Sequence, residues 1–447
     1  MTNKLLMREI FLKKINSNKL TVGIVGLGYV GLPLAEAFIN KGIKIIGYDI
    51  SHKRIEDLLS GKSGMKHIAN ERVENLLHTG LFSATTDHQE LETVDAILIC
   101  VPTPLDDYLQ PNLTYVEKTC HTLKQILRSG QIIILESTTY PGTTTDIMKP
   151  ILEESGLVSG ADFALAYSPE REDPGNPDFE TSTIPKVVGA DSEVERTMAH
   201  ELYNIIVKTV MVSNSRTAEA TKLVENIFRW VNIAMVNELK VIFEHMDIDI
   251  WEVVDAAKTK PFGFMPFYPG PGVGGHCIRI DPYYLTWKAR QYGVSTRFIE
   301  LAGEVNMRMP HRVVSRLLEE MSLRNKKALA TSKVLLLGIA YKKNIDDMRE
   351  SPSLELINLM RQHGAEVDYY DPFVSTIPPN SQHPELGGMN SISWDLKSFE
   401  SYDACLVATG HTNVDYEAIV KVIPLMVDTR NVTKSIFDKY SERIVKA

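Results

Sequence analysis

The feature that most constrains this chain is a glycine-rich turn, Gly26-Leu-Gly28-Tyr-Val-Gly31, placed directly after the apolar run Thr21–Val25. Between a strand and a helix, such a turn holds a pyrophosphate against the free amides and the positive dipole end of the helix. Asp49 ends the next β-branched run, eighteen residues after Gly31. Its carboxylate suits the 2′-hydroxyl of NAD and would repel the 2′-phosphate of NADP, a preference that Arg54 nearby tempers slightly. The turn therefore predicts an NAD site, the alternative being a purely structural glycine turn.

Short β-branched runs alternate with helical stretches in two parts of the chain, as in parallel sheets with crossover helices. In the first part the predicted strands are Thr21–Val25, Ile43–Tyr48, Ala96–Val101, Gln131–Glu136, Phe163–Tyr167 and Lys186–Gly189. After a polar linker, 325–332, the predicted strands are Val334–Gly338, Ala365–Tyr370, Ala404–Thr409 and Leu425–Asp428, with 378–388 as a loop. Both parts are therefore expected to be α/β.

Between these parts, strand patterns disappear from Ser213 to about Met321. One apolar series there keeps a 3.6-residue period: Leu223, Ile227, Val231, Ala234, Met235, Leu239, Ile242 and Met246. It predicts a single helix of about thirty residues, and its apolar residues on more than one side predict packing against a second copy of the chain. We thus expect an NAD-binding Rossmann-like domain at 1–212, a helical dimerisation and catalytic domain at 213–324, and a second Rossmann-like α/β domain at 325–447.

Composition excludes several classes of protein. The net charge of −9 lacks the basic surface of a nucleic-acid binder, and no run reaches the ~18 apolar residues of a membrane span. Four widely spaced cysteines argue against a disulfide framework or a zinc site, so we expect no metal and a reducing cytosol. The first nineteen residues lack the apolar core of a signal peptide; apolar Leu5, Leu6, Ile10 and Phe11 instead predict a short helix on the domain surface.

A candidate nucleophile stands in Gly272-Val-Gly-Gly-His-Cys277-Ile-Arg-Ile-Asp281, a segment without strand or helix periodicity. Its glycines allow a ligand to approach the backbone, and Asp281 places a carboxylate four residues after the thiol. A free thiol has a pKa near ~8.5 and needs a neighbouring cation to ionise at neutral pH. Lys222 and Asn226, on one face of the long helix, are candidates for that surrounding, while a buried structural thiol and a solvated lysine are the alternatives. Cys100, Cys120 and Cys405 are interpreted as packing residues.

A cofactor for electrons and a thiol for acyl chemistry together suggest an oxidation through a thioester. Glu170 follows a predicted strand, at the sheet edge where open α/β folds bind ligands. Local spacing does not rank Glu170 against Glu172 or Asp173. His276 adjoins the thiol, but adjacent side chains usually point apart, so we interpret it as structural.

With these residues the chain resembles, over nearly its whole length, the UDP-glucose/GDP-mannose dehydrogenase family of NAD-dependent sugar-nucleotide 6-dehydrogenases. Seven motifs in chain order carry the resemblance: Gly26–Leu34, Val101–Pro104, Glu136–Thr138, Ser168–Glu170, Lys222 with Asn226, Gly274–Asp281 and Gly338–Pro352. The stretch 259–272 is similar to the subgroup that acts on UDP-N-acetylhexosamines, as in bacterial UDP-N-acetylglucosamine 6-dehydrogenases.

The resemblance implies a homodimer or larger homo-oligomer, with NAD on the first domain and the UDP-sugar on the last. Cys277 would be the nucleophile, with Lys222, Asn226 and Asp281 around the oxygen on C6, Glu170 assisting thioester hydrolysis and Thr138 near the catalytic water. Implied or predicted cofactor contacts are Gly26, Gly28, Tyr29, Val30, Gly31, Asp49, Arg54, Thr103, Thr138 and Arg349. Implied substrate contacts are Glu170, Arg171, Lys222, Asn226, Lys260, Phe267, Tyr268, Gly274, Lys342 and Arg430.

Two residues depart from the family pattern. Arg279 stands where the subgroup commonly has proline, and the position of a second family acid falls on Pro174, so that either Glu172 substitutes or that role is absent. The expected reaction is a four-electron oxidation of UDP-GlcNAc to a UDP-hexosaminuronic acid for surface polysaccharide, with UDP-GalNAc, UDP-ManNAc and UDP-glucose as alternative substrates. A two-electron β-hydroxyacid dehydrogenase and a catalytically silent NAD and sugar-nucleotide sensor are the rival functions.

Overall fold

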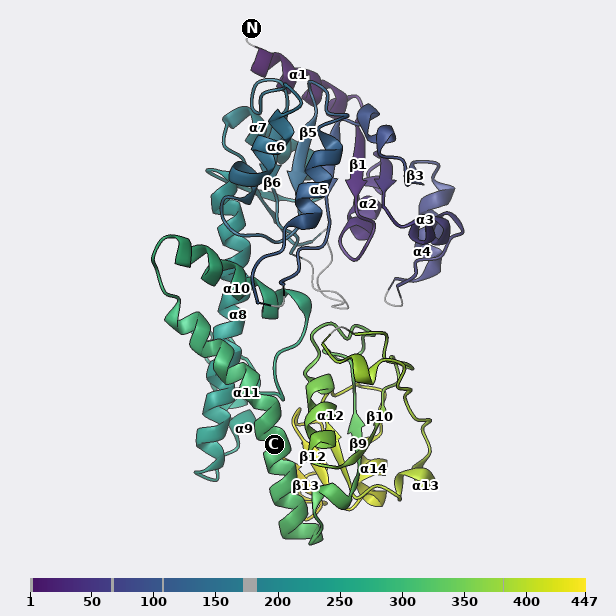
Figure 1. The fold of residues 1–447 in the computed structure, drawn as a ribbon, viewed down its shortest axis with the longest axis vertical. Helices are drawn as coiled ribbons and strands as arrows, with labels where there is room; N and C mark the ends of the chain where they lie inside the picture. Colours follow the sequence, from purple (N-terminus) through teal and green to yellow (C-terminus); the bar gives the residue numbers. More distant parts are fainter. Residues whose placement is uncertain (1–2, 66–67, 107, 172–182, 381) are drawn as a thin grey trace. The chain divides into compact units, whose positions relative to one another are not determined.

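A computed structural model describes residues 3–65, 68–106, 108–171, 183–380 and 382–447, with only the backbone of Asn3, His276 and Cys277 (Figure 1). The chain folds as two compact units. The first comprises Met1–Asn226 with Ile280–Ser295, and the second comprises Ile227–Arg279 with Thr296–Ala447. The division into three domains at 212 and 324 stays a prediction.

The first unit is built on an eight-stranded sheet of order β3-β2-β1-β4-β5-β6-β7-β8. Its strands are β1 (Thr21–Val25), β2 (Lys44–Tyr48), β3 (Phe82–Thr85), β4 (Ala96–Ile99), β5 (Ile132–Leu135), β6 (Ala164–Tyr167), β7 (Lys186–Gly189) and β8 (Thr209–Val212). Neighbours are parallel except β6 and β7, which are antiparallel. All six predicted strands are present. The sequence analysis did not list the edge strands β3 and β8, which are only partly buried; β3 lacks a continuous apolar run, whereas β8 has one.

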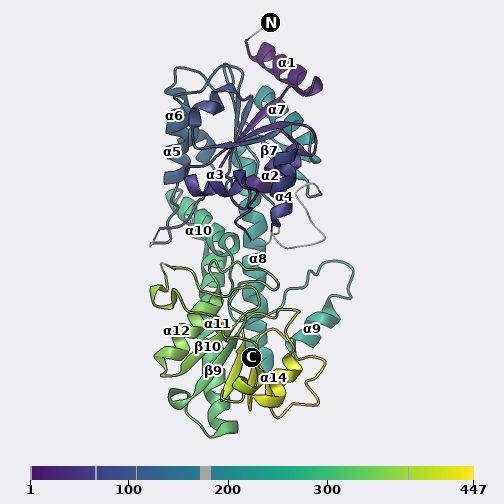
Figure 2. The ribbon, with the colours of Figure 1, turned by 90° about the vertical axis from the view of Figure 1, so that its right-hand side faces the viewer.

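Helices cover both faces of this sheet. They are α1 (Asn3–Asn16), α2 (Gly31–Ile39), α3 (His52–Leu59), α4 (Asn70–His78), α5 (Thr114–Leu123), α6 (Lys149–Glu153) and α7 (Glu193–Asn204). Figure 2 shows α5 and α6 on one side of the sheet and α2, α4 and α7 on the other. Strand residues alternate accordingly: Ile132 and Ile134 join the core cluster of α2, α4 and α7, while Ile133 and Leu135, also buried, point to the opposite face.

The predicted N-terminal surface helix is confirmed as α1, but its packing face differs from the expected one. Met7 and Phe11 are buried against the unit, whereas Leu5, Leu6 and Ile10 are exposed. A periodic set of apolar residues does not by itself say which of them face the core, and α1 is apolar on several sides. Its last turn is tied down by Lys14, whose Nζ lies 2.5 Å from the carboxylate of Asp95.

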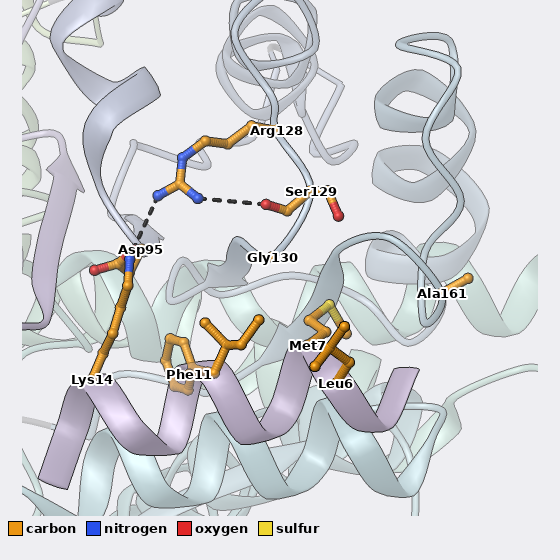
Figure 3. Close-up of a pocket in the computed structure, with 10 residues that line it drawn as sticks. Leu6, Met7, Phe11, Lys14, Asp95, Arg128, Ser129, Gly130 and Ala161 are labelled. Carbon is orange, nitrogen blue, oxygen red and sulfur yellow. Dashed lines mark hydrogen bonds and ion pairs between the residues drawn. The ribbon is translucent and has the colours of Figure 1, made fainter. Parts of the chain in front are cut away.

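A groove of about 260 Å³ runs beside α1, lined by Leu6, Met7, Ile10 and Phe11 and by the chain around Arg128 (Figure 3). Arg128 donates to Asp95 at 3.0 Å and to backbone carbonyl oxygens of the same edge. The groove therefore lies at the amino-terminal edge of the strands, opposite the carboxyl edge where open parallel sheets bind ligands.

Helices dominate the middle of the chain, as predicted. They are α8 (Ser215–Glu244), α9 (Ile250–Ala257), α10 (His276–Gln291) and α11 (Arg297–Glu320). With 30 residues, α8 is the expected long helix. The start of α10 corrects the interpretation of the glycine-rich segment as aperiodic: Cys277 and Asp281 occupy one helix, one turn apart, because the glycines end at Gly275 and helical backbone begins directly after them. No helix among the described residues is both long and apolar enough to cross a membrane.

The second unit carries a five-stranded parallel sheet of order β10-β9-β11-β12-β13. Its strands and helices are β9 (Lys333–Leu337), α12 (Pro352–Gln362), β10 (Glu366–Tyr370), α13 (Leu396–Phe399), β11 (Ala404–Val407), α14 (Tyr416–Val422), β12 (Met426–Asp428) and β13 (Ile444–Lys446). One face packs on α11 and α12, the other on α13 and α14. The four predicted strands are present, and β13 is an edge strand of three residues that the sequence pattern missed.

Two stripes run along α8. Glu219, Lys222 and Asn226, spaced by three and four residues, are buried polar side chains on one side. Four large apolar residues on another side remain exposed, at spacings of four, seven and seven: Val224, Phe228, Met235 and Ile242. A heptad-like apolar stripe is the pattern that packs against another helix.

We therefore expect the chain to form a homodimer through this exposed stripe. Met235→Glu places a charge in its middle and should shift the chain from dimer to monomer in size-exclusion chromatography with light scattering. Val158→Glu, which changes an equally exposed apolar residue off α8, should leave the oligomer intact. A monomeric wild-type chain, or an unchanged dimer in the Met235 variant, would contradict the expectation.

Candidate active site

The glycine-rich turn joins β1 to α2, and each glycine there has a separate steric reason. Gly26 has a φ of 92°, a left-handed conformation that side chains rarely adopt. A Cβ on Gly31 would collide with the carbonyl oxygen of Gly26, so the helix could not start so close to the strand. A Cβ on Gly28 would meet no atom within 4 Å, which leaves the backbone open in front of the helix. Open backbone before an uncapped helix N-terminus suits a pyrophosphate.

Asp49 lies beside this turn and is oriented by it. Its Oδ2 accepts from the amide of Leu27 at 3.0 Å, and its Oδ1 accepts from the amide of Ser51 at 3.0 Å. Arg54 donates through Nε and Nη2 to the carbonyl oxygen of Leu27, at 2.9 and 2.6 Å, and through Nη1 to that of Ser63. Burial lowers the pKa of Arg54, against the opposing effect of Asp49. With its donors committed to carbonyl oxygens, Arg54 is poorly placed to take a 2′-phosphate.

The sheet order reverses between β1 and β4, and the carboxyl ends of these strands form the crevice where dinucleotides bind in such folds. Thr103 follows β4 and is buried, and its carbonyl oxygen accepts from the Tyr284 hydroxyl at 3.1 Å. Thr138 follows β5 and is half-buried. Tyr29 and Val30 lie in the turn itself. These residues therefore share one sheet edge with the turn, as predicted, whereas Arg349 belongs to the second unit.

The candidate catalytic residues of the first unit converge through α8. The Lys222 ammonium donates to the carbonyl oxygen of Glu170 at 2.6 Å, and the Asn226 amide donates to the carboxylate of Asp281. Lys222, Asn226 and Asp281 are buried, at 7%, 1% and 1% exposure. Buried polar groups persist only when hydrogen-bonded, so these bonds fix the loop after β6 and the helix α10 against α8.

Arg171 adds a second tie between this loop and α8. Its guanidinium lies 2.6 Å from the Glu225 carboxylate and donates to the carbonyl oxygen of Pro185 at 2.6 Å. Its backbone amide donates to Oε1 of Glu170 at 2.6 Å. Arg171 therefore orients Glu170, and most of its own donors face protein groups.

Several buried ionisable residues at this edge were missed by the sequence analysis. Glu136 at the end of β5 accepts from Lys186 Nζ at 2.7 Å and from the Tyr203 hydroxyl. Glu219 accepts from the amides of Gly142 and Thr144, at 2.5 and 2.8 Å, and burial raises its pKa. For Glu136 the sequence contained a signal, because this charged residue ends an otherwise apolar strand. Charged residues are rarely buried unless they are paired.

The side chain of Cys277 lies outside the described part of the chain, and so does that of His276. The backbone places Cys277 in the first turn of α10, one turn before Asp281. Residues i and i+4 share one face of a helix, so positions 277 and 281 are on the same face of α10. Glu172, Asp173 and Pro174, between which the sequence left a second acid open, also fall outside the described residues.

The second unit repeats the strand–glycine–strand arrangement of the first. The Gly26 amide donates to the carbonyl oxygen of Tyr48 at 2.8 Å, and the Gly338 amide donates to that of Tyr370 at 2.9 Å. Asp371 occupies the place of Asp49, but it is buried and lies 3.1 Å from His411 Nε2.

The environment of Asp371 closes it to a ribose. The Asn344 amide donates to Nδ1 of His411, and Nε2 of His411 lies within hydrogen-bond distance of Asp371, at 3.1 Å. Burial raises the pKa of Asp371, but hydrogen bonds from His411 and from the backbone outweigh burial, and the pKa is lowered. With its oxygens also accepting from Ile339, Phe373 and Val374, this acid has no free face for a ligand.

Three of the predicted substrate residues, Arg430, Gly274 and Lys342, lie on loops of the second unit. Arg430 follows β12, and burial lowers its pKa to about 10 against the effect of Asp428. A Cβ on Gly270 would collide with the Arg430 guanidinium, so the backbone at Gly270 lies directly against this arginine. Gly274 packs against Tyr341, and Lys342 follows on the same loop after β9.

Other residues that were predicted to bind the substrate or the cofactor contact protein side chains in this structure. The Tyr268 hydroxyl donates to Asp255 at 2.7 Å, and Phe267 packs edge-on against Phe228. Lys260 lies over the Phe262 ring. Arg349 forms a bidentate pair with Asp347, and Arg279 pairs with Glu350 at 3.1 Å.

Family models match most of the chain in three pieces. All three models describe the UDP-glucose/GDP-mannose dehydrogenase family. The NAD binding domain matches residues 20–207, the central domain matches 216–308 and the UDP binding domain matches 335–435. The UDP-N-acetyl-D-glucosamine 6-dehydrogenase of Pseudomonas aeruginosa is 37% identical, over 88% of this chain and 91% of its own length.

Pyrococcus horikoshii provides a similar sequence and a similar solved structure. Its UDP-N-acetyl-D-mannosamine dehydrogenase is 34% identical over 92% of this chain and 96% of its own. A solved structure of UDP-D-ManNAc dehydrogenase from that organism superposes with a TM-score of 0.83 at 33% identity, covering 92% of this chain and 96% of the other.

Fold, glycine turn and comparisons together define an NAD-dependent oxidoreductase that acts on nucleotide sugars. The chain belongs to the UDP-glucose/GDP-mannose dehydrogenase family, and it is a UDP-sugar dehydrogenase. The resemblance found in the sequence is thereby confirmed, and so is NAD as the cofactor.

The geometry of Asp49 and Arg54 generates a prediction about the choice of cofactor. Asp49→Asn keeps the shape and one acceptor oxygen but removes the charge that repels a phosphate, so the ratio of kcat/KM for NAD to that for NADP should fall by on the order of tenfold. Glu56→Gln, a surface change on α3, should leave that ratio unaltered. Initial rates with both cofactors measure it, and a wild-type preference for NADP would overturn the assignment of Asp49.

Proposed function

We propose that the chain oxidises C6 of a UDP-N-acetylhexosamine in two steps to the UDP-hexosaminuronic acid, with UDP-GlcNAc as the first candidate substrate. One observation carries the proposal: Lys222 and Asn226, on one face of α8, hold Glu170 and Asp281 at the same buried edge. Cys277 stands one helical turn from Asp281 on α10. An acid, an ammonium, an amide and a thiol so placed are the parts that an oxidation through a thioester requires.

In the first half-reaction, a water held by Asp281 and Lys222 accepts the proton of the C6 hydroxyl. The Lys222 ammonium and the Asn226 amide stabilise the developing oxyanion, which is the largest single contribution in many such sites. NAD⁺, when bound at the glycine turn, supplies the hydride acceptor for each oxidation. The protein supports this cofactor through the open backbone at Gly28 and through the Asp49 carboxylate.

In the second half-reaction, the Cys277 thiolate adds to the C6 aldehyde and gives a thiohemiacetal, whose oxidation yields a thioester. The first turn of a helix favours the thiolate, because the helix dipole and the free amides lower the pKa of a thiol there. Glu170 then helps water to cleave the thioester. The uronic acid product suits the synthesis of surface polysaccharide.

The rival functions differ in their electron count. A two-electron β-hydroxyacid dehydrogenase yields one NADH per substrate and needs no thiol, and a silent sensor yields none. The four-electron proposal requires two. The match of the UDP binding domain model to 335–435 favours a nucleotide sugar over a small hydroxy acid.

For the sugar, the proposal rests on the 2-acetamido group. Both relatives named above carry N-acetylhexosamines in their names, one of the gluco and one of the manno configuration. In this chain Phe262, Phe264 and Tyr268 remain 70%, 39% and 42% exposed, and they belong to the same segment as Gly270, which contacts Arg430. Exposed aromatic rings offer an apolar wall on which an acetamido methyl can pack.

The thioester route predicts the behaviour of Cys277 variants. Cys277→Ala should abolish uronate formation and leave NAD binding, measured by titration calorimetry, nearly unchanged, because the glycine turn is untouched. Cys277→Ser should stall as a covalent or hemiacetal adduct visible by mass spectrometry. Cys120→Ala, a change of a buried thiol in α5, should retain two NADH per substrate. Full turnover by the Cys277→Ala enzyme would refute the thioester.

Sugar choice is testable by NADH absorbance with UDP-GlcNAc, UDP-GalNAc, UDP-ManNAc, UDP-glucose and GDP-mannose. Burial of the acetamido methyl is worth on the order of 1 kcal/mol, and its amide hydrogen bonds add discrimination. We expect UDP-GlcNAc first and UDP-GalNAc second, with kcat/KM at least about tenfold above UDP-glucose. Phe264→Ala should narrow this ratio and Tyr292→Ala, an exposed aromatic elsewhere, should not. A better rate with UDP-glucose or GDP-mannose would refute the sugar assignment.

A further inference from the structure

A buried lysine faces two carboxylates at the carboxyl edge of the first sheet. Lys186 Nζ lies 2.7 Å from Oε2 of Glu136 and 3.7 Å from Oε2 of Glu170. The side chains of Lys186 and Glu136 are 3% and 0% exposed, and that of Glu170 is 15% exposed. The lysine also donates to the carbonyl oxygen of Pro169 at 3.4 Å, next to Glu170.

Strand direction brings Lys186 to this place. Strand β7 is antiparallel to β6, and Gly189 pairs with Tyr167. The first residue of β7, Lys186, therefore extends past the carboxyl end of β6 and reaches the loop that carries Glu170. A strand parallel to β6 would have placed its first residue at the opposite edge.

The Lys186–Glu136 pair is buried, and burial acts on both of its members. Burial raises the pKa of Glu136, Lys186 opposes that rise and Glu170 adds to it. Burial alone would lower the pKa of Lys186, but the carboxylates of Glu136 and Glu170 outweigh it and raise that pKa, which keeps the lysine charged. Tyr203 donates to the second oxygen of Glu136, so this acid is held on both sides. Glu136 therefore anchors the lysine, and the remaining attraction of the ammonium is directed to Glu170.

Glu170 is held by the described residues through both its backbone and its carboxylate. Its amide donates to the carbonyl oxygen of Glu136 at 3.3 Å, and its carbonyl oxygen accepts from Lys222. Its Oε1 accepts from the Arg171 amide, and its Oε2 faces Lys186. Lys186 is thus a side-chain cation directed at the carboxylate, whereas the Lys222 ammonium is bonded to the backbone carbonyl oxygen.

We propose that Lys186 is a positioning residue for thioester hydrolysis, which orients the Glu170 carboxylate as the base. The inference rests on the proposed function of Glu170. In this step water gives a proton to Glu170 while its oxygen bonds to the C6 carbonyl carbon. The carbon–sulfur bond then breaks, the Cys277 thiolate leaves, and the new carboxylic acid loses its proton to solvent.

A purely structural ion pair is the alternative, and neutral variants separate the two. Lys186→Gln alone would leave Glu136 as an unpaired buried charge and could disturb folding. Glu136→Gln with Lys186→Gln replaces the pair by two amides, which can hydrogen-bond to each other without charge. Glu136→Gln alone is the matched control: the side chain keeps an amide oxygen that can accept from Lys186 Nζ, so the ammonium stays anchored and still faces Glu170. Thermal unfolding would establish that both variants fold.

The experiment compares the effect of each variant on kcat with its effect on kcat/KM. Hydrolysis follows both oxidations, so its loss lowers kcat and KM together while kcat/KM for the UDP-sugar is retained. We expect the double variant to lose about 10- to 100-fold in kcat, with a retained burst of two NADH per site and a thioester on Cys277 detected after acid quench. The Glu136→Gln control should stay within about threefold of wild type.

Equal kcat values for the control and the double variant would overturn the proposal, and so would a parallel loss in kcat and kcat/KM, which indicates structural damage. Glu170→Gln in the same experiment tests the function on which the inference rests. If Glu170→Gln hydrolyses the thioester at the wild-type rate, the role of Glu170 fails. If it accumulates the thioester and the double variant does not, only the role of Lys186 fails.

Discussion

The structure depends above all on the buried polar stripe of α8. A buried polar group that lacks a hydrogen bond costs about 1 to 3 kcal/mol, so each residue of the stripe has to meet a partner from another segment. Glu219 holds the loop after β5, Lys222 holds the loop after β6, and Asn226 holds Asp281 of α10. Three segments far apart in the chain are thereby fixed against one helix. On its other side α8 carries exposed apolar residues, which are stabilised when they are covered. That side therefore offers a surface for a second copy of the chain.

The two α/β sheets use one local device for two purposes. In each, a glycine after the first strand donates to the end of the next strand, and an aspartate at that end accepts from the glycine loop. Asp49 remains half-buried at the open crevice and can meet a ribose. Asp371 is covered by His411 and by backbone amides, so it stabilises the loop and is closed to a ligand. The difference arises from the residues that pack on the acid, since the strands and loops that carry it are alike.

Charge around Glu170 is arranged so that attraction exceeds repulsion in a poorly solvated place. Glu136 alone would disfavour a second carboxylate nearby, because like charges in low dielectric repel strongly. Lys186 lies between the two carboxylates as a counter-charge, and the Lys222 ammonium donates to the backbone carbonyl oxygen of Glu170. A carboxylate that has to act as a base needs such surroundings, since burial by itself favours the protonated form. The antiparallel course of β7 is the element of the fold that makes this arrangement possible.

Local sequence patterns were sufficient for the inner elements and for the NAD turn. Strand β1 is found where its apolar run predicted it, and the 3.6-residue period predicted α8, because burial imposes these periods directly on residue choice. The motifs also pointed to Lys222, Asn226, Asp281 and Glu170 one by one. Their pairing was beyond local pattern: Glu136 and Lys186 are 50 residues apart and meet only because of the strand order and the reversal of β7. The sequence by itself determined which residues could do the chemistry, whereas the tertiary structure decided which of them face one another, since hydrogen bonds and ion pairs depend on distances that sequence separation does not encode.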